Sequence, residues 1–148
     1  MEDNNVMHRT DIEKVTDTHS ITVGYILWIF GFTGSHRFYY GKPISGTIWF
    51  CTFGLLGIGW LVDLFLIPHM DQEADQKYHT GKYDYNIAWI LLTYLGIFGI
   101  HRFYVGRYLH GIIYFLTGGL FFLGVIYDFW HLNEMVDEEN RSGPPLYR

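Results

Sequence analysis

The feature that most constrains the fold is an eleven-residue run that occurs twice. The first copy, GFTGSHRFYYG, occupies residues 31–41, and the second, GIFGIHRFYVG, occupies residues 96–106. Identities continue at the same offset, without a gap, as far as Asp63 in the first copy and Asp128 in the second. This register indicates a tandem duplication, so we expect two similar structural units.

Apolar residues gather in long blocks, which points to lipid as the surroundings of the chain. The mean hydropathy is only +0.08, because acidic segments separate the blocks. A helix needs about 20 mostly apolar residues to cross a bilayer, and four blocks have about this length. The sequence therefore predicts an all-α integral membrane protein with four transmembrane helices, at about 20–40, 44–68, 85–105 and 109–132.

These helices are expected to form two tandem hairpins. A polar tail covers residues 1–18, and the first two-transmembrane hairpin covers 19–69. An acidic, polar linker at 70–84 precedes the second hairpin at 85–132, and an acidic tail covers 133–148. An even number of crossings in each copy makes the copies parallel repeats and places both termini on the same side.

The hairpins also predict where the polar motifs lie. Each HRF motif is near a hairpin turn, so both motifs are expected at one face of the membrane. Asp63 and Asp128 follow these turns by about 20 residues, and a rise of about 1.5 Å per residue places them near the opposite face. The density of basic residues in the short turns favours turns in the cytoplasm under the positive-inside rule.

Composition excludes several functional classes. The net charge of -5 and the scattered lysines and arginines leave no basic surface for a nucleic acid. The single cysteine, Cys51, has no partner for an intrachain disulfide. No nucleophile lies beside a plausible base and no histidine cluster has metal-ligand spacing, so we expect no enzyme, no metal site and no cofactor.

Glycines recur within the repeated run at spacings of three and seven residues, hence on one helix face. Because the hydrophobic effect does not drive helices together in lipid, small residues there allow close packing of backbones. We therefore expect helix-packing roles for Gly31, Gly34, Gly41, Gly96, Gly99 and Gly106.

The HRFY runs have two interpretations. The arginines and aromatic side chains can anchor the helix ends at the membrane interface. This interpretation requires no ligand or partner. Alternatively, His36, Arg37, His101 and Arg102 form a site for an anionic lipid headgroup or an acidic partner.

Asp63 and Asp128 are carboxylates within apolar segments, where an unpaired charge is costly. One hypothesis is a structural hydrogen bond to Ser20, Thr22 or Asn86. The other is a role in conducting protons or cations. Outside the repeats, the PPLY sequence at 144–147 is similar to a WW-domain ligand, although a disordered tail explains it more simply.

The glycine-rich HRFY run between two apolar helices, followed by an aspartate, resembles the TM-two domain family, a module of two transmembrane helices. The resemblance covers about residues 20–68 and 85–132. It implies a membrane hairpin with a short polar turn and no established catalytic activity.

The family's Arg-Phe pair is matched at 37–38 and at 102–103. His36 and His101 occupy the place where some members carry aspartate, which weakens any analogy with receptor signalling motifs. Two copies without an attached soluble domain resemble a bacterial envelope protein, so we expect the bacterial inner membrane.

These observations predict a non-enzymatic, multi-pass membrane protein. Its expected role is that of a structural or interaction module that associates with itself or with another membrane protein. The alternative is a small transporter or channel component that uses Asp63 and Asp128.

Overall fold

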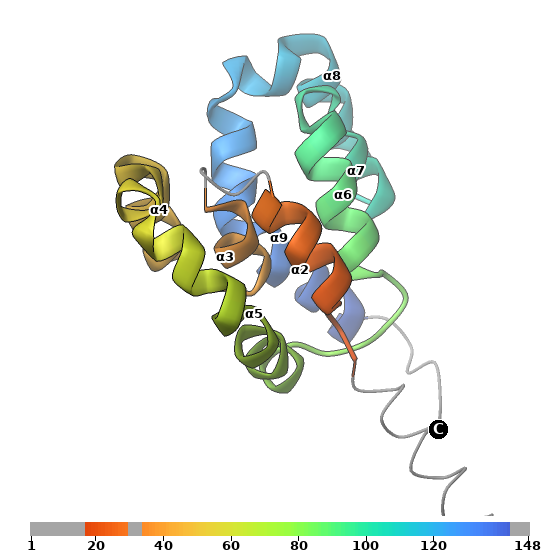
Figure 1. The fold of residues 1–148 in the computed structure, drawn as a ribbon. Helices are drawn as coiled ribbons and strands as arrows, with labels where there is room; N and C mark the ends of the chain where they lie inside the picture. The colour runs from red at the N-terminus through yellow and green to blue at the C-terminus, as the bar shows by residue number, and fades with distance from the viewer. Residues whose placement is uncertain (1–16, 30–33, 143–148) are drawn as a thin grey trace, which may run out of the picture.

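The computed structural model describes residues 17–29 and 34–142, which form helices joined by turns and contain no strand (Figure 1). This confirms the prediction of an all-α chain for the described residues. In chain order the helices are α2 (Ile21–Ile29), α3 (Ser35–Tyr39), α4 (Pro43–Leu56), α5 (Ile58–Lys77), α6 (Tyr85–Leu95), the 3₁₀ turn η2 (Gly96–Phe98), α7 (Ile100–Tyr104), α8 (Tyr108–Phe121) and α9 (Leu123–Ser142). Residues 1–16 and the PPLY motif lie outside the described residues.

The two copies of the sequence repeat have the same local structure. Helices α3, α4 and α5 return as α7, α8 and α9, with both ends of each helix displaced by the offset of the sequence repeat. The turn between α4 and α5 also has its counterpart between α8 and α9.

The long continuous helices expected from the apolar blocks are broken in the structure. The helix expected at 44–68 is divided into α4 and α5 by a left-handed stretch that begins within the end of α4, at Phe53, and ends at Gly57. An equivalent stretch from Gly118 to Phe122 divides the helix expected at 109–132. The prediction of continuous helices was therefore wrong. Within the described residues, no single helix combines the length and the apolar character that crossing a bilayer requires.

Each break reverses the chain and returns it to the level of the hairpin turn. Lys42, in the first turn, pairs with Glu73 near the end of α5. Arg107, in the second turn, donates from Nη2 to Glu138 Oε2 at 2.7 Å. The turns thus lie beside the linker and the end of α9. We call this side, formed by residues 17–20, 40–42, 70–84, 105–107 and 133–142, the polar end.

A buried polar contact joins the two repeats at the inner side of the polar end. Asn133 of α9 donates from Nδ2 to the Tyr39 carbonyl at 2.7 Å and accepts at Oδ1 from Trp89 Nε1 at 2.6 Å. All three side chains are at most 2 % exposed. Helix α9 therefore contacts α3 of the first repeat as well as α6 and α8 of its own (Figure 1).

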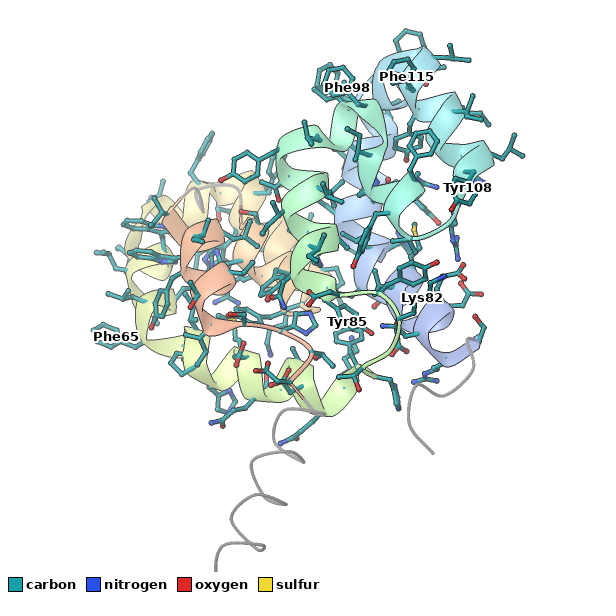
Figure 2. All side chains as sticks on the ribbon, turned by 90° about the vertical axis from the view of Figure 1, so that its right-hand side faces the viewer. Phe65, Lys82, Tyr85, Phe98, Tyr108 and Phe115 are labelled. Atoms are coloured by element: carbon teal, nitrogen blue, oxygen red, sulfur yellow. The ribbon has the colours of Figure 1, made fainter. Side chains whose placement is uncertain are left out.

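Large apolar side chains cover the outer surface away from the polar end. Leu56 is 89 % exposed, Phe121 82 % and Phe65 81 %. Figure 2 shows Phe65, Phe98 and Phe115 pointing outward from the helices. The molecule thus has one polar end and an extensive apolar exterior.

The polar end contains a carboxyl group in an unfavourable environment, which gives a prediction about pH. Burial, followed by the negative charges of Asp75 and Asp17, raises the pKa of Asp71 to about 6. One of its carboxyl oxygens is buried and has no hydrogen-bond partner. Since the folded state holds this proton more tightly than the unfolded chain, the contribution of Asp71 to stability falls as the pH rises from about 4 through 6.

We predict that Asp71→Asn stabilises the detergent-solubilised protein at pH 7.5 by about 2 kcal/mol and has less effect at pH 4.5. Thermal unfolding at both pH values measures the difference. Glu73→Gln is the control. It removes the carboxylate that pairs with Lys42, whose hydrogen bond and charge lower the Glu73 pKa, so it should not stabilise at pH 7.5. An equal effect of Asp71→Asn at both pH values would contradict the prediction.

Candidate functional site

Short helix α3 places His36 and Arg37 in the interior of the first repeat. It begins after Gly34, whose φ of 67° is left-handed and therefore suits glycine. A Cβ atom at Gly34 would lie 2.7 Å from the Gly46 carbonyl oxygen and 2.8 Å from Trp49 Cβ. Glycine thus allows α3 to pack directly on α4.

Asp63 of α5 accepts hydrogen bonds from both side chains. Arg37 donates from Nε to Asp63 Oδ2 at 2.9 Å and from Nη2 to Oδ1, a two-pronged contact. His36 Nε2 lies 2.7 Å from Asp63 Oδ2. Because an ionised carboxylate only accepts, the histidine proton in this contact is on Nε2. Asp63 and His36 are fully buried, and Arg37 is 8 % exposed.

The second repeat contains the same arrangement. Arg102 donates from Nε to Asp128 Oδ2 at 2.9 Å and from Nη2 to Oδ1. His101 Nε2 lies 2.6 Å from Asp128 Oδ2. We call His36, Arg37 and Asp63, and likewise His101, Arg102 and Asp128, the two charge clusters.

An aromatic ring covers each arginine. The guanidinium carbon of Arg37 lies 3.7 Å from the centre of the Trp49 ring, and that of Arg102 lies 4.2 Å from the Tyr114 ring. The Tyr114 hydroxyl also accepts a hydrogen bond of 2.9 Å from Arg102 Nη2. Cation–π contacts of this kind strengthen when water is excluded.

Glycines in α5 and α9 make room for these rings. A Cβ atom at Gly59 would lie 2.7 Å from Trp49 Cζ2, and one at Gly124 would lie 2.5 Å from the Tyr114 hydroxyl. Each glycine precedes the aspartate of its cluster by one helical turn. The spacing therefore lets one helix supply both the carboxylate and the space for the ring.

The chemistry of the clusters is that of a structural ion pair. A buried arginine and a buried aspartate neutralise each other. Burying either charge without the other would cost a large desolvation free energy. His36 Nδ1 and His101 Nδ1 are buried without a hydrogen-bond partner. With all six residues at most 8 % exposed, the clusters leave a substrate no direct access to the carboxylates.

The structure brings together residues that the sequence analysis had separated. The expectation that the HRF motifs and the two aspartates lie at opposite faces was wrong, because the left-handed breaks turn α5 and α9 back toward α3 and α7. The expected aspartate partners Ser20, Thr22 and Asn86 are replaced by histidine and arginine. The overlooked signal was a shared spacing: histidine precedes aspartate by 27 residues in both repeats.

Contact of His36, Arg37, His101 and Arg102 with a headgroup remains a prediction. In this structure each of these side chains forms an ion pair with the aspartate of its own cluster. This arrangement gives the transporter hypothesis no support.

The glycines singled out in the sequence occupy several environments. Gly34 and Gly99 begin α3 and α7 with left-handed φ, and Gly99 packs on Tyr114 as Gly34 packs on Trp49. Gly41 and Gly106 lie in the two turns, against the Tyr78 and Tyr83 rings. Gly96 contacts Leu92 and Val125, and Gly31 is outside the described residues.

Comparison with known proteins matches the two units separately. The pattern of the TM2 domain matches residues 17–65 and 81–130, and each segment contains one complete charge cluster. The chain belongs to the TM2 domain family. The matched segments end shortly after Asp63 and Asp128, so the TM2 domain includes the first part of α5 and of α9, which carries the aspartate.

Relatives with the same domain occur in several eukaryotes. A TM2 domain-containing protein of Dictyostelium discoideum is 50 % identical over 54 residues, which is 36 % of this chain and 39 % of that protein. A second protein of the same organism is 45 % identical over 60 residues, which is 40 % of this chain and 39 % of that protein. Human TM2 domain-containing protein 1 is 46 % identical over 50 residues, which is 34 % of this chain and 24 % of that protein. No solved structure matches the chain.

The comparisons support a membrane protein, and the names of the family and of these relatives indicate no catalytic function. The matched segment spans about two fifths of the Dictyostelium relatives and about a quarter of the human one. Since these relatives are eukaryotic, they give no support to the bacterial envelope expected from the sequence.

The charge clusters predict strong, non-additive effects of substitution. Asp63→Asn leaves the Arg37 charge buried without its counter-charge, and we expect a loss of about 3 kcal/mol or more in the free energy of unfolding. Arg37→Gln should have a similar effect. The double variant should lose clearly less than the sum of the two single losses, because each single variant already removes the pair.

Unfolding of the detergent-solubilised variants measures these losses, and the matching Asp128 and Arg102 variants repeat the test in the second unit. Lys42→Gln is the control, because it removes an ion pair whose partners are partly exposed to solvent and which should matter little. Additive losses at positions 37 and 63 would show that these side chains do not interact.

Proposed function

We propose that this TM2 domain protein is a non-enzymatic, multi-pass membrane protein that acts as a structural or interaction module. The observation that carries the proposal is the distribution of charge. The charged residues of the apolar segments are paired inside the protein, and apolar side chains cover the outside. This is the distribution that a protein surrounded by acyl chains requires.

The exterior supports a lipid environment. Contiguous exposed apolar patches of more than a few hundred Å² are rare on soluble monomers and mark interaction or membrane surfaces. Here, apolar side chains at least 69 % exposed occur on α4, α5, α8 and α9: Ile44, Phe53, Leu56, Ile58, Phe65, Leu109, Leu116, Phe121 and Leu123.

The helix breaks are compatible with this environment because they satisfy backbone groups locally. The Gly57 amide donates to the Phe53 carbonyl at 3.1 Å, and the Leu55 amide donates to Thr52 Oγ1 at 3.1 Å. In the second repeat, the Leu120 amide donates to Thr117 Oγ1 at 3.0 Å. Irregular backbone at membrane depth needs such partners, since no water is available there.

In the proposed arrangement, four apolar segments form two membrane-embedded units, and the polar end lies at one membrane surface. The five described basic residues outside the charge clusters all lie at this end: Lys42, Lys77, Lys82, Arg107 and Arg141. The positive-inside rule then favours a cytoplasmic polar end. Association with a second copy or another membrane protein would use the apolar exterior.

Cys51 provides a direct test of membrane embedding. It is the only cysteine of the chain and is exposed on α4. In native membranes we expect protection from a charged, water-soluble maleimide, labelling by an apolar maleimide, and labelling by both after denaturation in detergent. Quantitative gel-shift labelling measures all three reactions.

The control combines Cys51→Ser with Glu73→Cys, which moves the thiol to the polar end. This variant should react with the charged reagent, in inverted vesicles if the polar end is cytoplasmic. Equal labelling of positions 51 and 73 by the charged reagent would overturn membrane embedding.

A photo-crosslinker at Phe65 in the same membranes tests the interaction role. It should yield a defined dimer or complex, and monomer alone would argue against an interaction role at this face.

A further inference from the structure

The second repeat contains a hollow of about 670 Å³ between α8 and α9. Arg102, Arg107 and Glu138 line its polar side, near the polar end. Leu120 and Leu123 line its apolar side, near the left-handed break. The hollow therefore runs from a charged region to a region of the apolar exterior.

Three positions lining the hollow are more polar than their equivalents in the first repeat. Trp49, Val62 and Leu66 of the first repeat correspond to Tyr114, Tyr127 and His131. Tyr114 has a smaller ring than Trp49 and carries a hydroxyl. The second unit thus has polar groups around this hollow that the first unit lacks, although the charge clusters of the two units are the same.

The charges facing the hollow are of both signs. The positive charge of Arg102 is balanced by Asp128, and the hydrogen bonds described for Arg102 use Nε and Nη2. A guanidinium has five N–H donors, so Nη1 retains donors for a ligand. Arg107 donates from Nη2 to Glu138 Oε2 at 2.7 Å, and Glu134 is a second lining carboxylate.

This balance discriminates between ligand classes. A ligand with only negative charge would face Glu134 and Glu138, and one with only positive charge would face Arg102 and Arg107. Like charges brought together in a partly buried site repel strongly. A molecule with both a phosphate and an ammonium group matches both walls, and an attached acyl chain matches Leu120 and Leu123.

We propose that the hollow between α8 and α9 binds a zwitterionic phospholipid. The phosphate lies beside Arg102 and Arg107, the ammonium group beside Glu134 and Glu138, and one acyl chain along Leu120 and Leu123. The proposal rests on the membrane location proposed above. It differs from the anionic headgroup expected from the sequence, because it takes account of the glutamates of α9.

Lipid retention tests the proposal. The full chain is purified in mild detergent, supplied with equal amounts of phosphatidylethanolamine and phosphatidylglycerol, and examined by native mass spectrometry. We expect phosphatidylethanolamine to be retained about fivefold over phosphatidylglycerol, the ratio that one favourable charge contact at a membrane surface provides. Glu138→Gln should lower the ratio, whereas Glu139→Gln should not, because Glu139 contacts Arg107 but does not line the hollow.

Tyr114→Trp places the first-repeat residue in the second repeat. It removes the lining hydroxyl and narrows the hollow, so it should reduce retention at least about fivefold. Trp49→Tyr is its control and should leave retention unchanged. Equal retention of the two lipids, a preference for phosphatidylglycerol, or no effect of both Glu138→Gln and Tyr114→Trp would overturn the proposal. Free phosphoethanolamine that displaces the lipid at equal concentration would overturn the role of the acyl chain.

The proposed function can fail separately from this inference. If Cys51 is protected in membranes but phosphatidylethanolamine and phosphatidylglycerol are retained equally, only the proposed lipid site is wrong. If Cys51 reacts freely with the charged maleimide, membrane embedding is wrong as well.

Discussion

The structure depends on the contact between an arginine and an aspartate that lie far apart along the chain. Asp63 and Asp128 are fully buried, and a buried carboxylate is stable only with a counter-charge and hydrogen bonds. Arg37 and Arg102 supply both. The contact requires α5 to return to α3, and α9 to α7, so it determines the path of each repeat.

Other features of the repeat follow from this contact. The arginine needs cover, which Trp49 or Tyr114 provides, and the ring needs space, which Gly59 or Gly124 leaves. Because the charges of the apolar segments are paired inside, the outer faces of the helices can be apolar. Most remaining charge lies at the polar end, where water is expected.

Part of this architecture is predictable from the sequence. The offset between the two HRFY runs predicts two equivalent units, and the structure repeats its helix bounds at the same offset. Apolar blocks indicate helices, but they do not reveal breaks within them. Phe53 and Leu55 adopt left-handed φ although neither is a glycine, so local preference does not predict this turn. The pairing of arginine with aspartate is a tertiary contact, and only its repeated spacing hinted at it.

The distance between positions 42 and 73 tests the folded-back repeat most directly. In a Cys51→Ser background, spin labels at Lys42→Cys and Glu73→Cys can be measured by double electron–electron resonance in membranes. The structure places these side chains in contact, so a short distance typical of neighbouring labels is predicted. A continuous helix through this segment would separate them by roughly 45 Å, and a distribution centred there would contradict the account.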